Sequence, residues 1–346
     1  MSWRDRLTTP DLPVPTLTET IAARRRFFGD AAVDPRSGAV RADQVLVAWF
    51  GCASFAVALG GTVVLLDAWV PRGVTSGYVP TTPAEVAALR PAAIFIGHGH
   101  FDHAADAGPI ALASGAVLHG TAEHCATARK QVDGELRCVE LGSASSQPGD
   151  SYEFELHDGL SVTAVRHIHS ARTPRHEGPG ASAPVRPTPC LCDIRTHPPT
   201  LADGAHLARN IAAPEGGVLL YQFRCGDFIL TWHDSSGPLL DRAPQVLDAL
   251  RALPRSDVHI GAVQGFNQFT NGLRDPRSYI EALRPKVFVP NHHDNWLPVF
   301  TARGEAFRTP LHDEIARLPE AERPEIRMFL DPADYLASGR LAFDLS

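Results

Sequence analysis

Short apolar runs separated by glycine-containing turns dominate the chain after residue 43. Residues 45–49, 55–59 and 63–66 are rich in valine, leucine and other apolar residues, and Gly51 and Gly60 interrupt them. Runs of this length bounded by turn residues are typical of β-strands. The pattern therefore predicts three consecutive strands, the last of which ends at residue 66.

The next segment predicts a helix followed by a buried strand. Thr82 and Glu85 have the spacing of a capping box, with Pro83 at the first helical position, so a helix is expected over residues 82–89. Residues 92–96 are wholly apolar, as expected for a strand that is covered on both faces. This strand leads directly into a histidine-rich segment.

The second half of the chain repeats the alternation of strands and helices. Two predicted hairpins are followed by two later strands, each with a helix before it. The hairpins cover residues 152–156 with 161–165 and 218–223 with 228–231, the helices 245–250 and 276–283, and the later strands 258–263 and 286–289. Two β-rich halves with helices outside them suggest a layered α/β sandwich.

Three regions follow from these patterns. Residues 1–43 form an N-terminal extension with a predicted helix over 17–28, and residues 44–346 form the main domain. Within that domain, residues 171–215 are rich in proline, glycine, alanine and arginine, and only 205–211 look helical. Because so long an irregular stretch in a compact domain is usually functional, we expect this insertion to act as a lid.

Composition narrows the functional classes. The 346 residues carry a formal net charge of −7, which argues against nonspecific nucleic-acid binding through phosphate neutralisation. No apolar run approaches the roughly 18–20 residues of a membrane span, and the first residues lack an apolar signal region. The six scattered cysteines, including Cys190 and Cys192, are expected to be reduced thiols. We therefore expect a cytoplasmic protein without integral membrane association.

The strongest chemical signal is the sequence His98-Gly-His100-Phe-Asp102-His103, directly after the predicted buried strand. Divalent cations are bound by imidazole nitrogens and carboxylate oxygens. On an extended segment residues two apart point the same way, so His98 and His100 can hold one ion. Asp102 and His103, at the start of the following helix, can face a second ion. The sequence therefore predicts a metal site.

This motif and four others, in the same order along the chain, resemble the metallo-β-lactamase superfamily. Asp67 after a strand resembles the first motif, and His169 with Ser170 resembles the strand-end histidine of the third. Asp234 resembles the aspartate of the fourth motif, although His233 stands where glycine usually does. His292, two residues after proline, resembles the last motif. The resemblance covers roughly residues 45–295 and implies a four-layer αββα sandwich.

The resemblance also implies a ligand set. His98, His100 and His169 would hold one metal, Asp102, His103 and His292 the other, and Asp234 would lie between them, with Asp67 supporting the metal loop. His167 competes with His169 for the third motif, and His293 competes with His292 for the last. His293 is then expected to line the pocket, and Asp294 to hydrogen-bond a ligand histidine.

The implied activity is metal-dependent hydrolysis, in which a hydroxide bridging two divalent ions attacks an ester or lactone of a small, anionic substrate. Zinc is the expected metal, with manganese or iron as alternatives. A phosphodiesterase is a second interpretation, and an oxidoreductase with a single iron, as in persulfide dioxygenases, is a third. The sequence leaves open whether identical chains assemble.

Residues 49–55 resemble the branch that includes ascorbate-6-phosphate lactonase and N-acylphosphatidylethanolamine phospholipase D. Many relatives have histidine where this chain has Cys52, so the role of that histidine is expected to be missing here. The insertion begins directly after His169 and carries several arginines. Because arginine suits bidentate recognition of carboxylate or phosphate, Arg172 and Arg175 are the candidate contacts to an anionic substrate.

Overall fold

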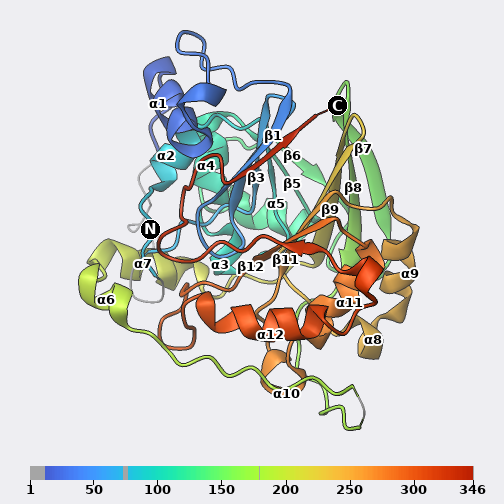
Figure 1. The fold of residues 1–346 in the computed structure, drawn as a ribbon. Coiled ribbons are helices and arrows are strands. Elements are labelled where there is room, and N and C mark those ends of the chain that lie inside the picture. Colours follow the sequence, from blue (N-terminus) through green and yellow to red (C-terminus); the bar gives the residue numbers. More distant parts are fainter. Residues whose placement is uncertain (1–11, 73–76, 179, 346) are drawn as a thin grey trace. The chain divides into compact units, whose positions relative to one another are not determined.

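The computed structural model describes residues 12–72, 77–178 and 180–345 of the chain (Figure 1). The chain divides into two compact units. The first unit comprises Met1–Ala144, Cys192–Gly216 and Pro332–Ser346, and the second comprises Ser145–Leu191 and Gly217–Asp331. Each unit contains one sheet. The first eleven residues of the predicted N-terminal extension lie outside the described part.

The sheet of the first unit has seven strands in the order β14-β1-β2-β3-β4-β5-β6. Strands β14, β1, β2 and β3 pair antiparallel, whereas β3, β4, β5 and β6 pair parallel. The strands are β1 (Gln44–Trp49), β2 (Phe55–Leu59), β3 (Thr62–Leu66), β4 (Ala93–Phe95), β5 (Val117–Gly120), β6 (Cys138–Glu140) and β14 (Leu341–Asp344). Because β3 and β4 are parallel, their carboxyl ends lie at the same edge of the sheet.

Threonine side chains cap the first two α-helices of the first unit. Thr16 and Glu19 form a complete capping box at the start of α1 (Leu17–Phe28), and Thr82 caps α2 (Pro83–Ala88). Helices α1 and α2 lie side by side (Figure 1), and Arg24 donates to the carbonyl oxygen of Leu89 at 2.9 Å. The other helices are α3 (Phe101–Ala104), α4 (Ala107–Ser114), α5 (Ala122–Arg129), α6 (Cys192–Thr196) and α7 (Leu201–Asn210).

The sheet of the second unit has seven strands in the order β13-β12-β11-β10-β9-β8-β7. Strands β7 to β10 pair antiparallel, and β10 to β13 pair parallel. The strands are β7 (Ser151–His157), β8 (Leu160–His167), β9 (Val218–Cys225), β10 (Phe228–His233), β11 (Val258–Ala262), β12 (Val287–Asn291) and β13 (Glu325–Ile326). Strands β8, β10, β11 and β12 consequently run in one direction and end at one edge.

Helices of the second unit pack apolar side chains against this sheet. Leu247 and Leu250 of α9 (Pro244–Ala252) join Tyr279 and Leu283 of α11 (Arg274–Leu283) in one buried cluster. Helix α12 (Glu305–Ile315) contributes Phe307, Leu311 and Ile315 to a second cluster. The remaining helices are α8 (Leu239–Arg242) and α10 (Gln268–Asn271). Burial of these apolar faces holds the helices in place.

The predicted strands and helices are confirmed, with ends shifted by a few residues, but three features differ. The insertion is more helical than predicted, because Thr200 and Asp203 form a capping box that starts α7 at Leu201, and α6 precedes it. Strands β6, β13 and β14 and helices α5, α8, α10 and α12 were not predicted. Cys190 and Cys192 form a disulfide, so the expectation of reduced thiols is wrong for this pair.

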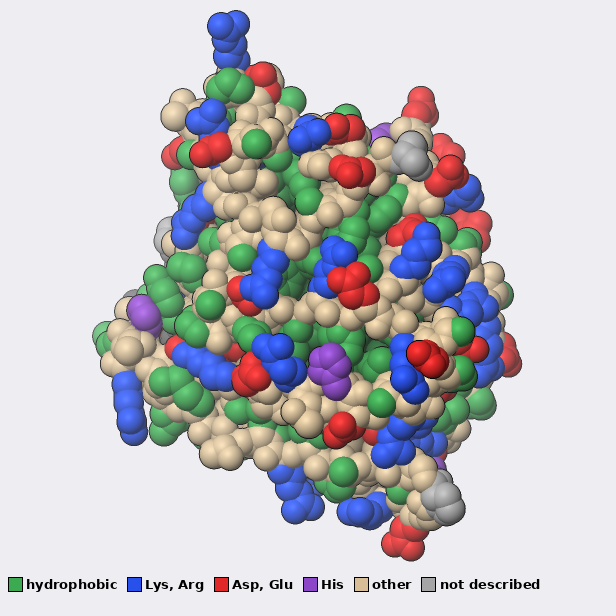
Figure 2. Space-filling view, viewed as in Figure 1, with side chains coloured by type: hydrophobic (Ala, Val, Ile, Leu, Met, Phe, Trp, Pro, Cys, Tyr) green, Lys and Arg blue, Asp and Glu red, His purple; other side chains and the backbone are tan. Residues whose placement is uncertain are grey.

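Two surface properties bear on the expected location and partners. Among the described residues, no helix combines the length and apolarity that crossing a membrane requires. Lysine and arginine side chains are interspersed with aspartate and glutamate on the face that Figure 2 shows. On this face the charges are therefore mixed rather than sorted by sign.

Candidate metal centre

The histidine-rich loop of the first unit is fixed by Asp67. This aspartate follows β3 with a φ of 55° and is fully buried. Its carboxylate accepts hydrogen bonds from the backbone N–H of Gly97 at 3.0 Å and from Nδ1 of His103 at 2.6 Å. The parallel neighbours β3 and β4 place Asp67 beside the loop that follows β4. Asp67 therefore orients the His103 ring so that Nε2 is the atom that would coordinate a metal.

The four motif residues bring their side chains together in this loop and at the start of α3. Nε2 of His98 lies 3.0 Å from Nδ1 of His100, and Nε2 of His103 lies 3.3 Å from Oδ2 of Asp102. Two nitrogens bound to one ion at about 2.0–2.1 Å would lie roughly 3.3 Å apart in tetrahedral geometry. The spacing and chemistry of these donors fit a divalent metal. His98, Asp102 and His103 are buried, whereas His100 is partly exposed.

Cys52 lies in the same group of side chains. Its sulfur, a carboxylate oxygen of Asp102 and a ring nitrogen of His103 all lie within 4.8 Å of one another, and all three residues are buried. No role for Cys52 was expected from the sequence, because many relatives have histidine at this position. One signal in the sequence could have identified Cys52. The residue lies in the turn that leads into β2, and β2 pairs with β3, the strand that directly precedes Asp67.

Gly99 lets the end of the insertion pack on the metal loop. Its N–H donates to the carbonyl oxygen of Glu215 at 2.7 Å, and a Cβ at this position would collide with the carbonyl oxygen of Pro214. Nε2 of His124 also contacts the Glu215 oxygen, at 3.0 Å. Only glycine allows this close approach of two backbone segments. The last residues of the insertion are thus neighbours of His98 and His100 in the chain's first unit.

The second unit presents its three predicted ligands from three strand ends. His169 lies two residues beyond β8, Asp234 directly follows β10, and His292 directly follows β12. These strands end at the same edge of the sheet. Asp234 is buried, whereas His169 and His292 are partly exposed. His292 has a φ of 56°, a conformation that costs energy for a residue other than glycine and that is found most often at functional sites.

His167 and His233 belong to the interior of the second unit. His167 is fully buried and its Nδ1 is hydrogen-bonded to the hydroxyl of Tyr279 at 2.9 Å, and burial lowers its pKa well below the usual value. Burial also lowers the pKa of His233 to about 4. The His233 ring replaces the glycine usual in the family, and Gly261 provides the space, because a Cβ there would lie 2.8 Å from His233 Nε2.

His293 and its neighbours also hold the interior together. Nε2 of His293, whose side chain is fully buried, donates to the carbonyl oxygen of Phe329 at 2.8 Å. Asn295 donates from its side chain to Cys190 and from its backbone to Asp331, at 2.9 Å and 3.1 Å. Asp294 is fully buried as well. These contacts assign His293 and Asn295 to packing of the loop after β12.

The arginines of the insertion differ in their surroundings. Arg166, just before it, is buried and donates to the carbonyl oxygen of Val218 at 3.1 Å. Arg172 is exposed, with its guanidinium 6.0 Å from the centre of the Phe269 ring, and Arg175 is exposed too. The exposed guanidinium groups of Arg172 and Arg175 can reach a ligand, whereas that of Arg166 is hydrogen-bonded to a backbone carbonyl oxygen.

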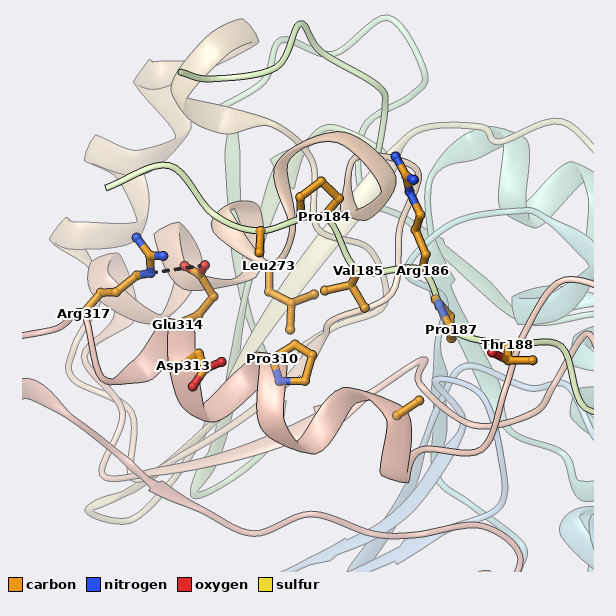
Figure 3. Close-up of a pocket in the computed structure, with 12 residues that line it drawn as sticks. Pro184, Val185, Arg186, Pro187, Thr188, Leu273, Pro310, Asp313, Glu314 and Arg317 are labelled. Atoms are coloured by element: carbon orange, nitrogen blue, oxygen red, sulfur yellow. Dashed lines mark ion pairs between the residues drawn. The ribbon is translucent and has the colours of Figure 1, made fainter. Parts of the chain in front are cut away.

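Part of the insertion covers a cavity of about 420 Å³ in the second unit (Figure 3). Residues 183–188 form one wall, and α12 supplies Pro310, Asp313 and Glu314 on the other. Glu314 pairs with Arg317 at 3.4 Å and with Arg277 at 3.1 Å. None of the predicted metal ligands lines this cavity. The chemistry expected from the sequence therefore does not take place in it.

Comparisons with known proteins agree with this fold and chemistry. The chain is 27% identical over 290 residues, 84% of its length, to a "UPF0173 metal-dependent hydrolase" of Pyrobaculum neutrophilum, of which 98% is covered. A protein of the same description from Methanopyrus kandleri is 24% identical over 256 residues, 73% of this chain and 86% of the relative. No model of a protein family matches the chain.

Among solved structures, Igni18, a metallo hydrolase from the hyperthermophilic archaeon Ignicoccus hospitalis, has a TM-score of 0.54 with 14% identity, covering 88% of this chain and all of its own. The two mixed sheets with their helices, the donors of the metal loop and these relatives define one class of protein. The chain is similar in sequence to metal-dependent hydrolases and shares the fold of a metallo hydrolase, which is the layered α/β sandwich that the resemblance to the metallo-β-lactamase superfamily implies. The resemblance inferred from the five motifs is confirmed.

Proposed function

We propose that the protein is a binuclear hydrolase that cleaves an ester or lactone of a small, anionic molecule. The observation that carries this proposal is the group of donors in the first unit. His98 and His100 lie in the loop after β4, Asp102 and His103 lie on the adjoining helix α3, and two pairs of donor atoms are 3.0 Å and 3.3 Å apart. Four donors in two adjacent pairs suit two ions better than one.

The second unit would supply the remaining ligands. His169, Asp234 and His292 match the family's later motifs in order, and each follows a strand that ends at the same edge of the sheet. We assign His169 to the ion of His98 and His100, His292 to the ion of Asp102 and His103, and Asp234 to both. Zinc is the expected metal, because imidazole-rich sites with carboxylates suit it.

Divalent ions bound there would lower the pKa of water and polarise the oxygen of the substrate. The protein's own groups would orient the reaction. Asp67 fixes the His103 ring and the start of the metal loop through its two hydrogen bonds, and the Asp234 carboxylate would accept a proton from the attacking water. The ester and lactone substrate class rests on the resemblance of residues 49–55.

Substitution of Asp102 by asparagine tests this assignment. Loss of the carboxylate charge should reduce kcat by at least roughly 10–100-fold, because removal of a residue that only supports a metal ligand already costs about that factor. The circular-dichroism spectrum should stay unchanged. Asp158→Asn, in the exposed turn between β7 and β8, is the matched control and should keep full activity. Equal activity of both variants would contradict the assignment.

A substrate panel tests the bond that is cleaved. Carboxylic esters and lactones, with and without an anionic group, should be hydrolysed by the metal-loaded protein, and phosphodiesters should not. Hydrolysis of phosphodiesters alone would replace the proposed substrate class by the second interpretation of the sequence.

A further inference from the structure

Cys52 is held in a tight turn between β1 and β2 of the first unit. The Nε1–H of Trp49 donates to the carbonyl oxygen of Cys52 at 3.1 Å, and backbone bonds of 3.0 Å and 2.9 Å join Phe50 to Ser54 and Ser54 to Gly51. Cys52 itself has a φ of 49° and is fully buried. A residue with a side chain adopts this backbone conformation only where its surroundings fix it, and such positions concentrate at functional sites.

The thiol that this turn fixes is directed at two predicted metal ligands. The sulfur of Cys52, a carboxylate oxygen of Asp102 and a ring nitrogen of His103 lie within 4.8 Å of one another. Atoms that bind one ion at about 2.0–2.3 Å cannot be more than roughly 4.6 Å apart. The three atoms can therefore share an ion after small movements of side chains.

A packing role alone explains less. A buried cysteine often serves as a small apolar residue, but the sulfur of Cys52 lies within 4.8 Å of a carboxylate oxygen and of an imidazole nitrogen, which are both potential metal donors. The same unit offers a contrast in Cys125, which is equally buried but lies on α5, where its sulfur is 4.0 Å from the carbonyl oxygen of Val139. No group of potential metal donors found among the described residues includes Cys125.

We propose that Cys52 is a thiolate ligand of the ion held by Asp102 and His103. This inference rests on the proposed function, which assigns those two residues to a metal. A thiolate is a soft ligand and favours zinc over manganese or magnesium. The sulfur thus restricts which metal can occupy this position.

Cobalt substitution tests the inference by spectroscopy rather than by activity. The protein is stripped with a chelator, reloaded with Co²⁺ and examined for the near-ultraviolet band that arises from charge transfer between a thiolate and cobalt. The wild-type protein and Cys125→Ala should show the band, whereas Cys52→Ala should lose it. Cys52→His should bind cobalt without the band, and it supplies the test if the alanine variant does not fold.

Zinc affinity provides a second measurement. Cys52→Ala should bind its more weakly held zinc ion at least 10–100-fold less tightly in competition with a chelating dye, because even partners outside the coordination shell contribute about that factor. Cys125→Ala should keep the wild-type affinity. An unchanged affinity in Cys52→Ala would overturn the inference.

The outcomes separate this inference from the proposed function. Wild-type protein that binds two cobalt ions without the band, or a band that persists in Cys52→His, would overturn the thiolate ligand and leave the binuclear centre intact. Wild-type protein that binds no cobalt would overturn both.

Discussion

The donors of the first unit and those of the second are built in different ways. In the first unit, the four donors come from one short segment, residues 98–103, which forms a loop and the start of α3, and Asp67 on the adjacent strand end holds this segment by two hydrogen bonds. In the second unit each predicted ligand comes from a different strand, and its position depends on the pairing of β8 to β12. A local loop is therefore secured by one buried carboxylate, whereas dispersed ligands are secured by the whole sheet.

Removal of the carboxylate that secures the loop should have the largest effect. Asp67→Ala deprives the His103 ring and the Gly97 N–H of a buried acceptor and places alanine at a φ of 55°. We expect metal affinity to fall by about 100-fold and the free energy of unfolding to fall by roughly 3 kcal/mol. Metal titration and urea denaturation measure the two losses. A wild-type metal affinity in this variant would show that the loop keeps its conformation without Asp67.

The second unit offers a sharper contrast in two adjacent histidines. His292→Ala should lose one metal ion with little change in stability. His293→Ala should keep both ions, but the free energy of unfolding should fall by about 2 kcal/mol, because the buried carbonyl oxygen of Phe329 loses its donor at 2.8 Å. Elemental analysis and denaturation of both variants measure this. Loss of an ion in His293→Ala but not in His292→Ala would mean that His293, and not His292, is the metal ligand of the last motif.

How far the sequence predicts the site follows from the same contrast. The motif from His98 to His103 is local, so four donors and their buried strand can be read from consecutive residues. The sequence favours His169 over His167 by its distance from the strand and its following serine alone, and the structure adds that the His167 ring is hydrogen-bonded to Tyr279 inside the second unit. Cys52 was missed because its neighbours in space, Asp102 and His103, lie far along the chain.

The fold shows the same limits. Strands with continuous apolar runs were predicted to within a few residues, since their burial on both faces is visible in composition. Strand β14 was not predicted, because it is short and its apolar and polar residues alternate only weakly. It also pairs with β1, far away in the sequence, where Gln44 lies opposite Asp344. Helix α12 contains Pro310, which obscured its helical pattern.

The smallest expected effect concerns the exposed arginines of the insertion, which remains a predicted lid. Arg172→Ala or Arg175→Ala should raise KM for an anionic substrate by about threefold to tenfold, as for loss of one exposed ionic contact of roughly 1 kcal/mol. KM for a neutral substrate should stay the same. Arg186→Ala, at the cavity of the second unit, is the matched control. Equal KM changes for both substrate types would argue against a lid that binds anions.

The central claim is that this hydrolase holds two metal ions per chain. Elemental analysis by mass spectrometry of active, exhaustively dialysed protein measures this directly, with activity followed as the ions are removed by a chelator and returned. We predict two zinc equivalents per chain and activity that falls as they leave and recovers with zinc. A fully active protein with one ion per chain would contradict the account, and a single iron would favour the oxidoreductase interpretation.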